Sequence, residues 1–259
     1  MMQLKKGGKA SFIPFVVAGS PSLELCEQAI EVLIAEGADV IELGVPFSDA
    51  MADGPVIQTA SEKAARTVSL KAVLELAKRV LAKHPGFPLV LFSYYNPILK
   101  MGLEKFADQA KATGIAAVLV VDLPPEEAGL YCQILGQREL GTVFLASPTT
   151  SEERLKRIAE ASSAFIYLVS RAGVTGEQKE LSGSLASEVA KVRKVTDKSV
   201  AIGFGISKSD QARAVAKLGD AVVVGSAFVR ILSSGEKPDL VLKQVRELAR
   251  DLATASHSG

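Results

Sequence analysis

The chain has 259 residues, of which 48% are hydrophobic and 23% charged, so it is long enough to bury a large core. Its formal net charge of +1 provides no positive surface for nucleic acid or for an anionic membrane. The basic N-terminus leads into a strand too short for a signal peptide, and no apolar run reaches the length of about 18 residues that a membrane span needs. We therefore expect a soluble, cytoplasmic protein that binds neither nucleic acid nor a membrane.

Short apolar segments alternate with amphipathic stretches along the whole chain. The expected strands cover residues 11–18, 40–43, 88–92, 117–121, 142–146, 165–169, 200–204 and 221–224. The expected helices cover residues 23–36, 58–66, 70–83, 103–113, 152–161 and 240–253, and a further helix is expected to open at Pro124 and Pro125. The stretches 93–98 and 170–183 are expected to be loops.

This order predicts the fold class. The strand segments are almost continuously apolar, which is typical of strands that are buried on both faces of a parallel sheet. Eight such α/β units close into a (β/α)8 TIM barrel, whereas a doubly wound sheet is disfavoured because no GxGxxG follows the first strand. We expect a single domain over residues 1–259, with a short extra helix after the eighth strand and a frayed tail at about 254–259.

Two carboxylates stand out in the segment IELGVPFSDAMADGP, residues 41–55. Glu42 belongs to a buried strand, and Asp53 follows it on the next loop. Burying a glutamate costs several kcal/mol unless it is paired, protonated or used in catalysis. Glu42 can equally be a strand-end residue that reaches solvent or pairs with a lysine.

Glycine-rich turns follow the sixth, seventh and eighth strands. They include Gly176, Gly205 and Gly225, and Ser226 is expected to cap a short helix. A helix N-terminus reached through glycines is a natural phosphate site, although each glycine alone can simply form a tight turn. The pattern predicts a phosphorylated small molecule whose reacting end faces Glu42 and Asp53. A carboxyl group in an apolar pocket can then act as both acid and base.

Metal chemistry is not indicated. The two cysteines, Cys26 and Cys132, have neither metal-ligand spacing nor a disulfide framework. The two histidines, His84 and His257, lie at a helix end and in the tail, and we interpret both as structural or solvated.

Six motifs in a fixed order carry a resemblance to a known family. They are FIPFVVAGSP from Phe12, ELGVPFSDxxADGPxIQ from Glu42, YYNPI from Tyr94, YLVSRAGVTG from Tyr167, GFGIS from Gly203 and VVVGSAFV from Val222. Over residues 12–232 the sequence resembles the tryptophan synthase alpha chain family. The resemblance implies retro-aldol cleavage of indole-3-glycerol phosphate to indole and glyceraldehyde 3-phosphate, in tryptophan biosynthesis. It also implies no cofactor in this chain, and a PLP-dependent beta chain as partner in an alpha–beta–beta–alpha tetramer.

The resemblance assigns roles to residues by matching position. It makes Glu42 the acid/base residue and Asp53 the hydrogen-bond acceptor for the indole N–H. The implied substrate-binding residues are Phe15, Tyr167 and Thr175, and the implied phosphate-binding residues are Gly176, Gly205, Gly225 and Ser226. The implied contacts with the beta chain are Pro46, Asp49, Asn96 and Pro124.

Some of these positions have simpler interpretations. Asp49 can cap the helix that follows it, and we interpret Asp122 as a strand-end or capping carboxylate rather than a catalytic one. Tyr94 and Tyr95 can be packing residues at the rim. Ala50 stands where the family usually has proline, which should loosen the second loop and weaken coupling to a partner.

Three other functions remain open from the sequence. The first is a stand-alone lyase that releases indole, and the second is an alpha chain that acts mainly as an allosteric, non-catalytic partner. The third, a sugar-phosphate isomerase or epimerase, is disfavoured because the chain lacks metal ligands and a suitable lysine or histidine base.

Overall fold

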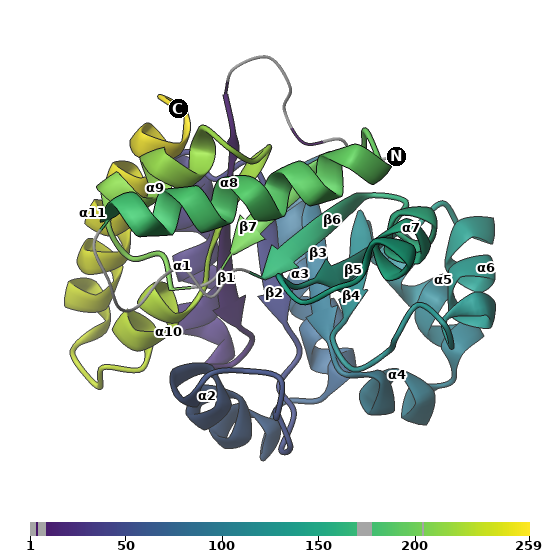
Figure 1. Ribbon diagram of the computed structural model, residues 1–259. Helices are drawn as coiled ribbons and strands as arrows, with labels where there is room; N and C mark the ends of the chain where they lie inside the picture. The colour runs from purple at the N-terminus through teal and green to yellow at the C-terminus, as the bar shows by residue number, and fades with distance from the viewer. Residues whose placement is uncertain (1–3, 5–8, 170–177, 204) are drawn as a thin grey trace.

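The computed structural model describes residue 4 and residues 9–169, 178–203 and 205–259, and it forms a closed barrel surrounded by helices (Figure 1). The strands are β1 (Ser11–Val17), β2 (Ile41–Gly44), β3 (Leu89–Ser93), β4 (Ala117–Val120), β5 (Gly141–Ala146), β6 (Phe165–Val169), β7 (Val200–Gly203) and β8 (Ala221–Val224). The helices are α1 (Leu23–Ala35), α2 (Pro55–Ala65), α3 (Leu70–Lys83), α4 (Tyr95–Met101), α5 (Leu103–Thr113), α6 (Gly129–Gln137), α7 (Glu152–Ala161), α8 (Gln178–Val195), α9 (Ser209–Ala216), α10 (Ser226–Leu232) and α11 (Pro238–Ser256).

The strands pair in parallel and in chain order, and β1 closes the barrel against β8. In that closing pair Ser11 lies beside Ala221 and Pro14 beside Val224. The predicted (β/α)8 barrel is therefore confirmed, and so is the short extra helix after the eighth strand, which is α10.

Alternation along each strand divides the side chains between two cores. Ile41 and Leu43 point outward into the large core between barrel and helices, whereas interior residues such as Val90 and Val143 fill the barrel. A third cluster, which includes Phe15, packs strand β1 against α2 and α10. This alternation turns Glu42, between Ile41 and Leu43, toward the barrel interior.

Three serines are the N-caps of helices. The side chains of Ser22, Ser69 and Ser151 accept hydrogen bonds from backbone N–H groups in the first turns of α1, α3 and α7. The predicted start of the helix at residue 152 is confirmed.

Three expectations for the connections are wrong. The stretch 93–98 contains the first residues of helix α4 rather than a loop, because Pro97 lies in its first turn, where no N–H is needed. The helix expected at Pro124 and Pro125 begins only at Gly129, since the prolines form a turn in which the Glu127 N–H donates to the Pro124 carbonyl. Helix α8 begins at Gln178, inside the segment expected to be a loop.

The expected frayed tail is also wrong. Helix α11 continues to Ser256, and Ala255 and Ser256 are buried. The His257 ring lies 2.7 Å from the Asp39 carboxylate, which also accepts the N–H of Phe12 on β1. The small, polar residues of the tail are typical of a flexible segment. The buried residues Ala255 and Ser256 and the contact between His257 and Asp39 nevertheless hold it against the barrel.

None of the helices in the described ranges is long and apolar enough to span a membrane.

Candidate active site

The candidate site lies at the carboxyl ends of the barrel strands. Figure 1 shows α2 and α4 at the end of the barrel toward which β1 and β2 point. In a parallel barrel the loops that follow the strands converge at this end, which is where TIM barrels carry their chemistry.

Glu42 is the central residue of the site. Its side chain is 2% exposed, and in the strand register Glu42 lies between Phe15 of β1 and Val90 of β3. Burial, and then the negative charge of Asp53, raise the pKa of Glu42 to about 8. The interpretation as a strand-end glutamate that reaches solvent is therefore wrong. The neutral carboxylic acid predominates near neutral pH and can donate a proton.

Asp53 lies on the loop between β2 and α2. The Tyr94 hydroxyl donates a hydrogen bond to Asp53 Oδ2 at 2.9 Å, and the same hydroxyl accepts the Ala52 N–H at 3.0 Å. Burial raises the pKa of Asp53, whereas the hydrogen bond from Tyr94 lowers it. The site therefore holds two carboxyl groups in different surroundings, one deeply buried and one bonded to a hydroxyl.

Tyr167 belongs to β6 and points into the barrel interior. Burial raises the pKa of its phenol first, and the charges of Glu42 and Asp53 raise it further. Tyr167 is therefore close enough to both carboxyl groups for their charges to act on its phenol.

Phe15 and Phe92 form an aromatic wall of the site. Their ring centroids lie 5.1 Å apart in an edge-to-face arrangement. Gly44 makes room for the wall, because a Cβ at position 44 would lie 2.7 Å from Phe15 Cζ. This apolar surface beside two carboxyl groups suits a flat, largely apolar ring with one polar edge.

The positions expected to bind phosphate are partly described. Gly205 has a φ of +70°, a backbone conformation that favours glycine. Gly225 is the N-cap of α10 and lies beside Phe15 and Ile57, so it faces the same mouth. Ser226 is the first residue of the helix rather than its cap, which corrects the expected capping role. Thr175 and Gly176 lie outside the described residues.

The four positions expected at a partner interface differ in exposure. Asp49 and Asn96 are exposed, Pro124 is half-buried, and Pro46 is buried. Asp49 does not cap the helix that follows, because the N-cap of α2 is Gly54. Asp122 is a carboxylate beyond the end of β4 whose Oδ1 accepts the N–H of Tyr95, the first residue of α4, although the N-cap of that helix is Tyr94.

The sequence did not reveal the roles of Tyr94, Ser61 and Phe92 in the site. The Ser61 hydroxyl accepts the N–H of Phe47 and donates to its carbonyl, so α2 holds the second loop by both backbone groups. The sequence places Tyr94 at the end of an apolar strand and at the start of the YYNPI motif, and neither signal distinguishes a role beside Asp53 from packing at the rim.

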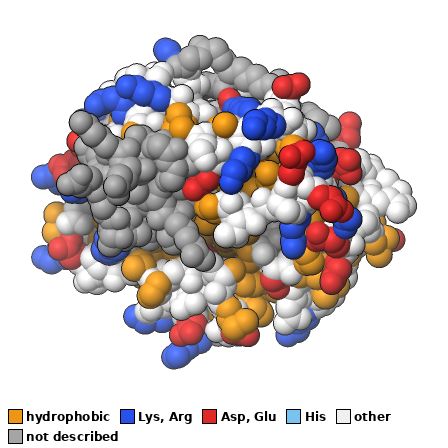
Figure 2. Space-filling view, viewed as in Figure 1, with side chains coloured by type: hydrophobic (Ala, Val, Ile, Leu, Met, Phe, Trp, Pro, Cys, Tyr) orange, Lys and Arg blue, Asp and Glu red, His pale blue; other side chains and the backbone are white. Residues whose placement is uncertain are grey.

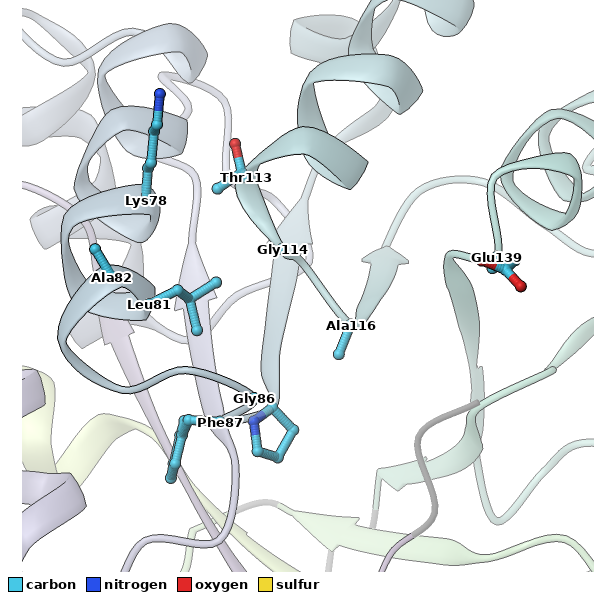
Figure 3. A pocket seen from close by; sticks show the side chains of 10 residues that line it. Lys78, Leu81, Ala82, Gly86, Phe87, Thr113, Gly114, Ala116 and Glu139 are labelled. Carbon is cyan, nitrogen blue, oxygen red and sulfur yellow. The ribbon is translucent and has the colours of Figure 1, made fainter.

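The two histidines and one cavity lie away from this mouth. His84 Nε2 lies 2.5 Å from Glu31, and His257 lies near Asp39, so both histidines have structural partners. A cavity of about 660 Å³ opens at the opposite end of the barrel, where turns lead into β3, β4 and β5 (Figure 3). The described residues contain no cluster of three or more His, Cys, Asp or Glu side chains that could hold a metal ion.

The sequence model of one family, described as "Tryptophan synthase alpha chain", matches residues 1–257. The chain belongs to the tryptophan synthase alpha chain family. This membership confirms the resemblance seen in the six motifs. The family reaction is cleavage of indole-3-glycerol phosphate in tryptophan biosynthesis, so the chain is a lyase, and a beta chain is its implied partner.

Individual relatives within the family agree. The alpha chain of Trichormus variabilis is 44% identical over 254 residues, which are 97% of this chain and 95% of that protein. The alpha chain of Burkholderia cenocepacia is 45% identical over 232 residues, 89% of this chain and 86% of that protein. The structure is similar to that of Mycobacterium tuberculosis tryptophan synthase, with a TM-score of 0.87, 33% identity and coverage of 97% and 94% of the two chains.

Proposed function

We propose that Glu42 and Asp53 carry out the cleavage of indole-3-glycerol phosphate. The observation that supports this most strongly is the buried Glu42 carboxyl group, whose pKa of about 8 keeps it protonated beside the carboxyl group of Asp53. Carbon–carbon cleavage needs a proton delivered to a ring carbon and a negative partner for the charge that appears on the ring.

The proposed reaction has two steps. Glu42 donates its proton to C3 of the indole ring, and the ring becomes a cation whose N–H donates a hydrogen bond to the Asp53 carboxylate. The Glu42 carboxylate then takes the proton of the hydroxyl on the glycerol carbon that is bonded to C3. That carbon becomes an aldehyde as the carbon–carbon bond breaks, and the electron pair of the bond returns to the ring to form neutral indole. Glu42 ends the cycle protonated.

The remaining assigned residues bind the substrate in this proposal. The wall of Phe15 and Phe92 and the ring of Tyr167 hold the indole, and Thr175 is a further proposed substrate-binding residue. The backbone at Gly176, Gly205, Gly225 and Ser226 binds the phosphate, far from the reacting carbon. Phosphate binding then contributes free energy that positions the substrate.

The proposed partner is a PLP-dependent beta chain in an alpha–beta–beta–alpha tetramer, with no cofactor in this chain and a cytoplasmic location. Three large apolar side chains are exposed on connections that follow successive strands: Met51 after β2, Leu99 on α4 and Leu130 on α6, at 78%, 53% and 63%. Figure 2 shows hydrophobic side chains at the lower edge of the molecule, between the places of α2 and α4. An exposed apolar surface beside Asp49, Asn96 and Pro124 supports an interface there.

Indole release from indole-3-glycerol phosphate tests this proposal. We expect slow release by the protein alone and a steep rise with a beta chain. Fast release by the protein alone would instead indicate a stand-alone lyase. Absence of release in both mixtures, while the beta chain is still activated, would indicate a non-catalytic allosteric partner.

The glutamate can be tested separately. Glu42→Gln is expected to fold normally and to lose cleavage by at least ~10³-fold, because an amide cannot supply the proton. Glu104→Gln, at an exposed glutamate on α5, is the matched control and should keep wild-type activity. Retained turnover in Glu42→Gln would contradict the acid/base assignment.

A further inference from the structure

Tyr94 connects two strands at the mouth of the barrel. It follows β3, is 4% exposed, and its hydroxyl is bonded at once to the Asp53 carboxylate and to the Ala52 N–H. We propose that Tyr94 is a positioning residue that holds Asp53 in place and keeps it ionised for the stabilisation of the indole cation. This inference rests on the proposed function of Asp53 and adds a residue to it.

The ring of Tyr94 is also held in place, by a contact separate from those of its hydroxyl. It stacks on Phe47 with a centroid distance of 4.9 Å and an interplanar angle of 28°. Phe47 is itself held by Ser61 through both of its backbone polar groups. Tyr94 therefore contacts the second loop near its beginning, through Phe47, and near its end, through Ala52 and Asp53.

The backbone around Tyr94 is tied to the neighbouring strands. The Ser93 hydroxyl donates to the Tyr94 carbonyl at 2.8 Å, and the next residue, Tyr95, donates its N–H to Asp122 beyond β4, also at 2.8 Å. The position of the Tyr94 hydroxyl is thus set by β3 and β4, and the hydrogen bond from this hydroxyl fixes the orientation of the Asp53 carboxylate. A carboxylate on a loop gains a defined orientation from a rigid partner on the barrel.

The direction of the hydrogen bonds favours a negative Asp53. The Ala52 N–H donates to the Tyr94 oxygen, and the Tyr94 O–H donates to Asp53, so the first bond polarises the second. A hydrogen bond donated to a carboxylate stabilises its charged form. Asp53 needs this support because burial favours its neutral form. Its described titratable neighbours are Glu42 on β2, Tyr94 after β3 and Tyr167 on β6, and none of them is a cation.

Tyr94→Phe tests the inference, because it removes the hydroxyl and keeps the ring that stacks on Phe47. We expect kcat/KM for indole release to fall by ~10- to 100-fold, the range for a lost hydrogen bond to a charged group. We also expect the acid limb of the pH profile of kcat/KM to move to higher pH, since Asp53 loses the donor that favours its charged form. A packing role alone would leave that limb unchanged.

Tyr95→Phe is the matched control. The Tyr95 ring packs edge-on against Tyr131 at 6.3 Å, and its neighbour Asp122 is bonded to its backbone rather than to its hydroxyl. We expect this variant to keep the wild-type kcat/KM and pH profile. In an Asp53→Ala background, Tyr94→Phe should cause no further loss of activity, because the hydroxyl acts through the missing carboxylate.

A measurement that does not depend on turnover separates this inference from the proposed function. The ¹³C signal of the Asp53 carboxyl group, assigned by its loss in Asp53→Asn, reports the pKa of that group directly. We expect this pKa to rise by about one unit or more in Tyr94→Phe and to stay unchanged in Tyr95→Phe. An Asp53 pKa that is the same in wild type and Tyr94→Phe overturns the inference, even if indole release confirms the proposed function. An unchanged kcat/KM in Tyr94→Phe overturns it as well.

Discussion

Gly203 on β7 lies directly against the ring of Tyr167 on β6. A Cβ at position 203 would come within 2.9 Å of Tyr167 Cζ and closer still to the hydroxyl oxygen. The two strands are paired neighbours, with Val169 beside Gly203, so the backbone cannot easily move away. Because glycine has no side chain, position 203 leaves room for the Tyr167 ring in the candidate site.

This relationship makes Gly203→Ala a test of where Tyr167 must lie. We expect the added methyl group to push the ring into the mouth, to lower kcat/KM by ~10²-fold and to cost about 1–3 kcal/mol in unfolding free energy. Gly136→Ala is the control, because a Cβ there meets no atom within 4 Å and alanine favours the helix α6. Full activity in Gly203→Ala would show that the position of the Tyr167 ring is not required.

The raised pKa of Glu42 predicts a pH dependence of stability. The folded state holds the Glu42 proton up to a pH of about 8, whereas the unfolded chain releases it near 4.5. Stability from this group is therefore present below 4.5 and is lost as pH rises through 8. Relative to Glu42→Gln, which stays neutral, wild type should lose about 1.4 kcal/mol of unfolding free energy per pH unit in that window.

Urea unfolding of both proteins between about pH 5 and pH 8 checks this slope. Comparing the two proteins removes the contributions of other groups, such as Glu27, whose lowered pKa acts in both. A difference that is constant with pH would mean that Glu42 titrates normally in the folded protein.

The same pKa predicts that indole release declines as pH rises through about 8, because the protonated carboxyl group starts the reaction.

The packed C-terminus predicts that its removal is costly. Deleting residues 255–259 exposes the surface that Ala255 and Ser256 cover and removes His257, one of the partners of Asp39. We expect a loss of about 2 kcal/mol in unfolding free energy, from buried area and one charged hydrogen bond. Ser258→Ala, at an exposed position, should change little. A deletion variant as stable as wild type would show that the tail contributes nothing to the fold.

The exposed apolar side chains on the α4 side of the mouth predict the site of partner binding. Leu99→Glu should weaken activation by a beta chain by ~10-fold or more and leave indole release by the protein alone unchanged. Leu240, 44% exposed on α11, is the matched control, because α11 packs against α1 and α9 rather than beside α4. Equal effects of Leu99→Glu and Leu240→Glu would contradict an interface at α4.

The amino-acid sequence determined the eight strands, most helices and the two carboxylates of this protein. These features are local, because a buried parallel strand needs a continuous apolar run, a helix needs an apolar stripe, and Ser22, Ser69 and Ser151 can cap only the turns that follow them. The family motifs determined the reaction class in the same way. Local reasoning failed where composition and packing disagree, as at the start of α4 and in the tail around His257.

Only the tertiary structure decided how the site is held together. Tyr94 and Asp53 are 41 residues apart, and Tyr95 and Asp122 are 27 apart, so no short-range pattern predicts either bond. The burial that raises the pKa of Glu42 likewise exists only once β1, β2 and β3 are side by side. The closure of the barrel brings the ends of distant strands together at one mouth, and the environment of each side chain there depends on all of its neighbours.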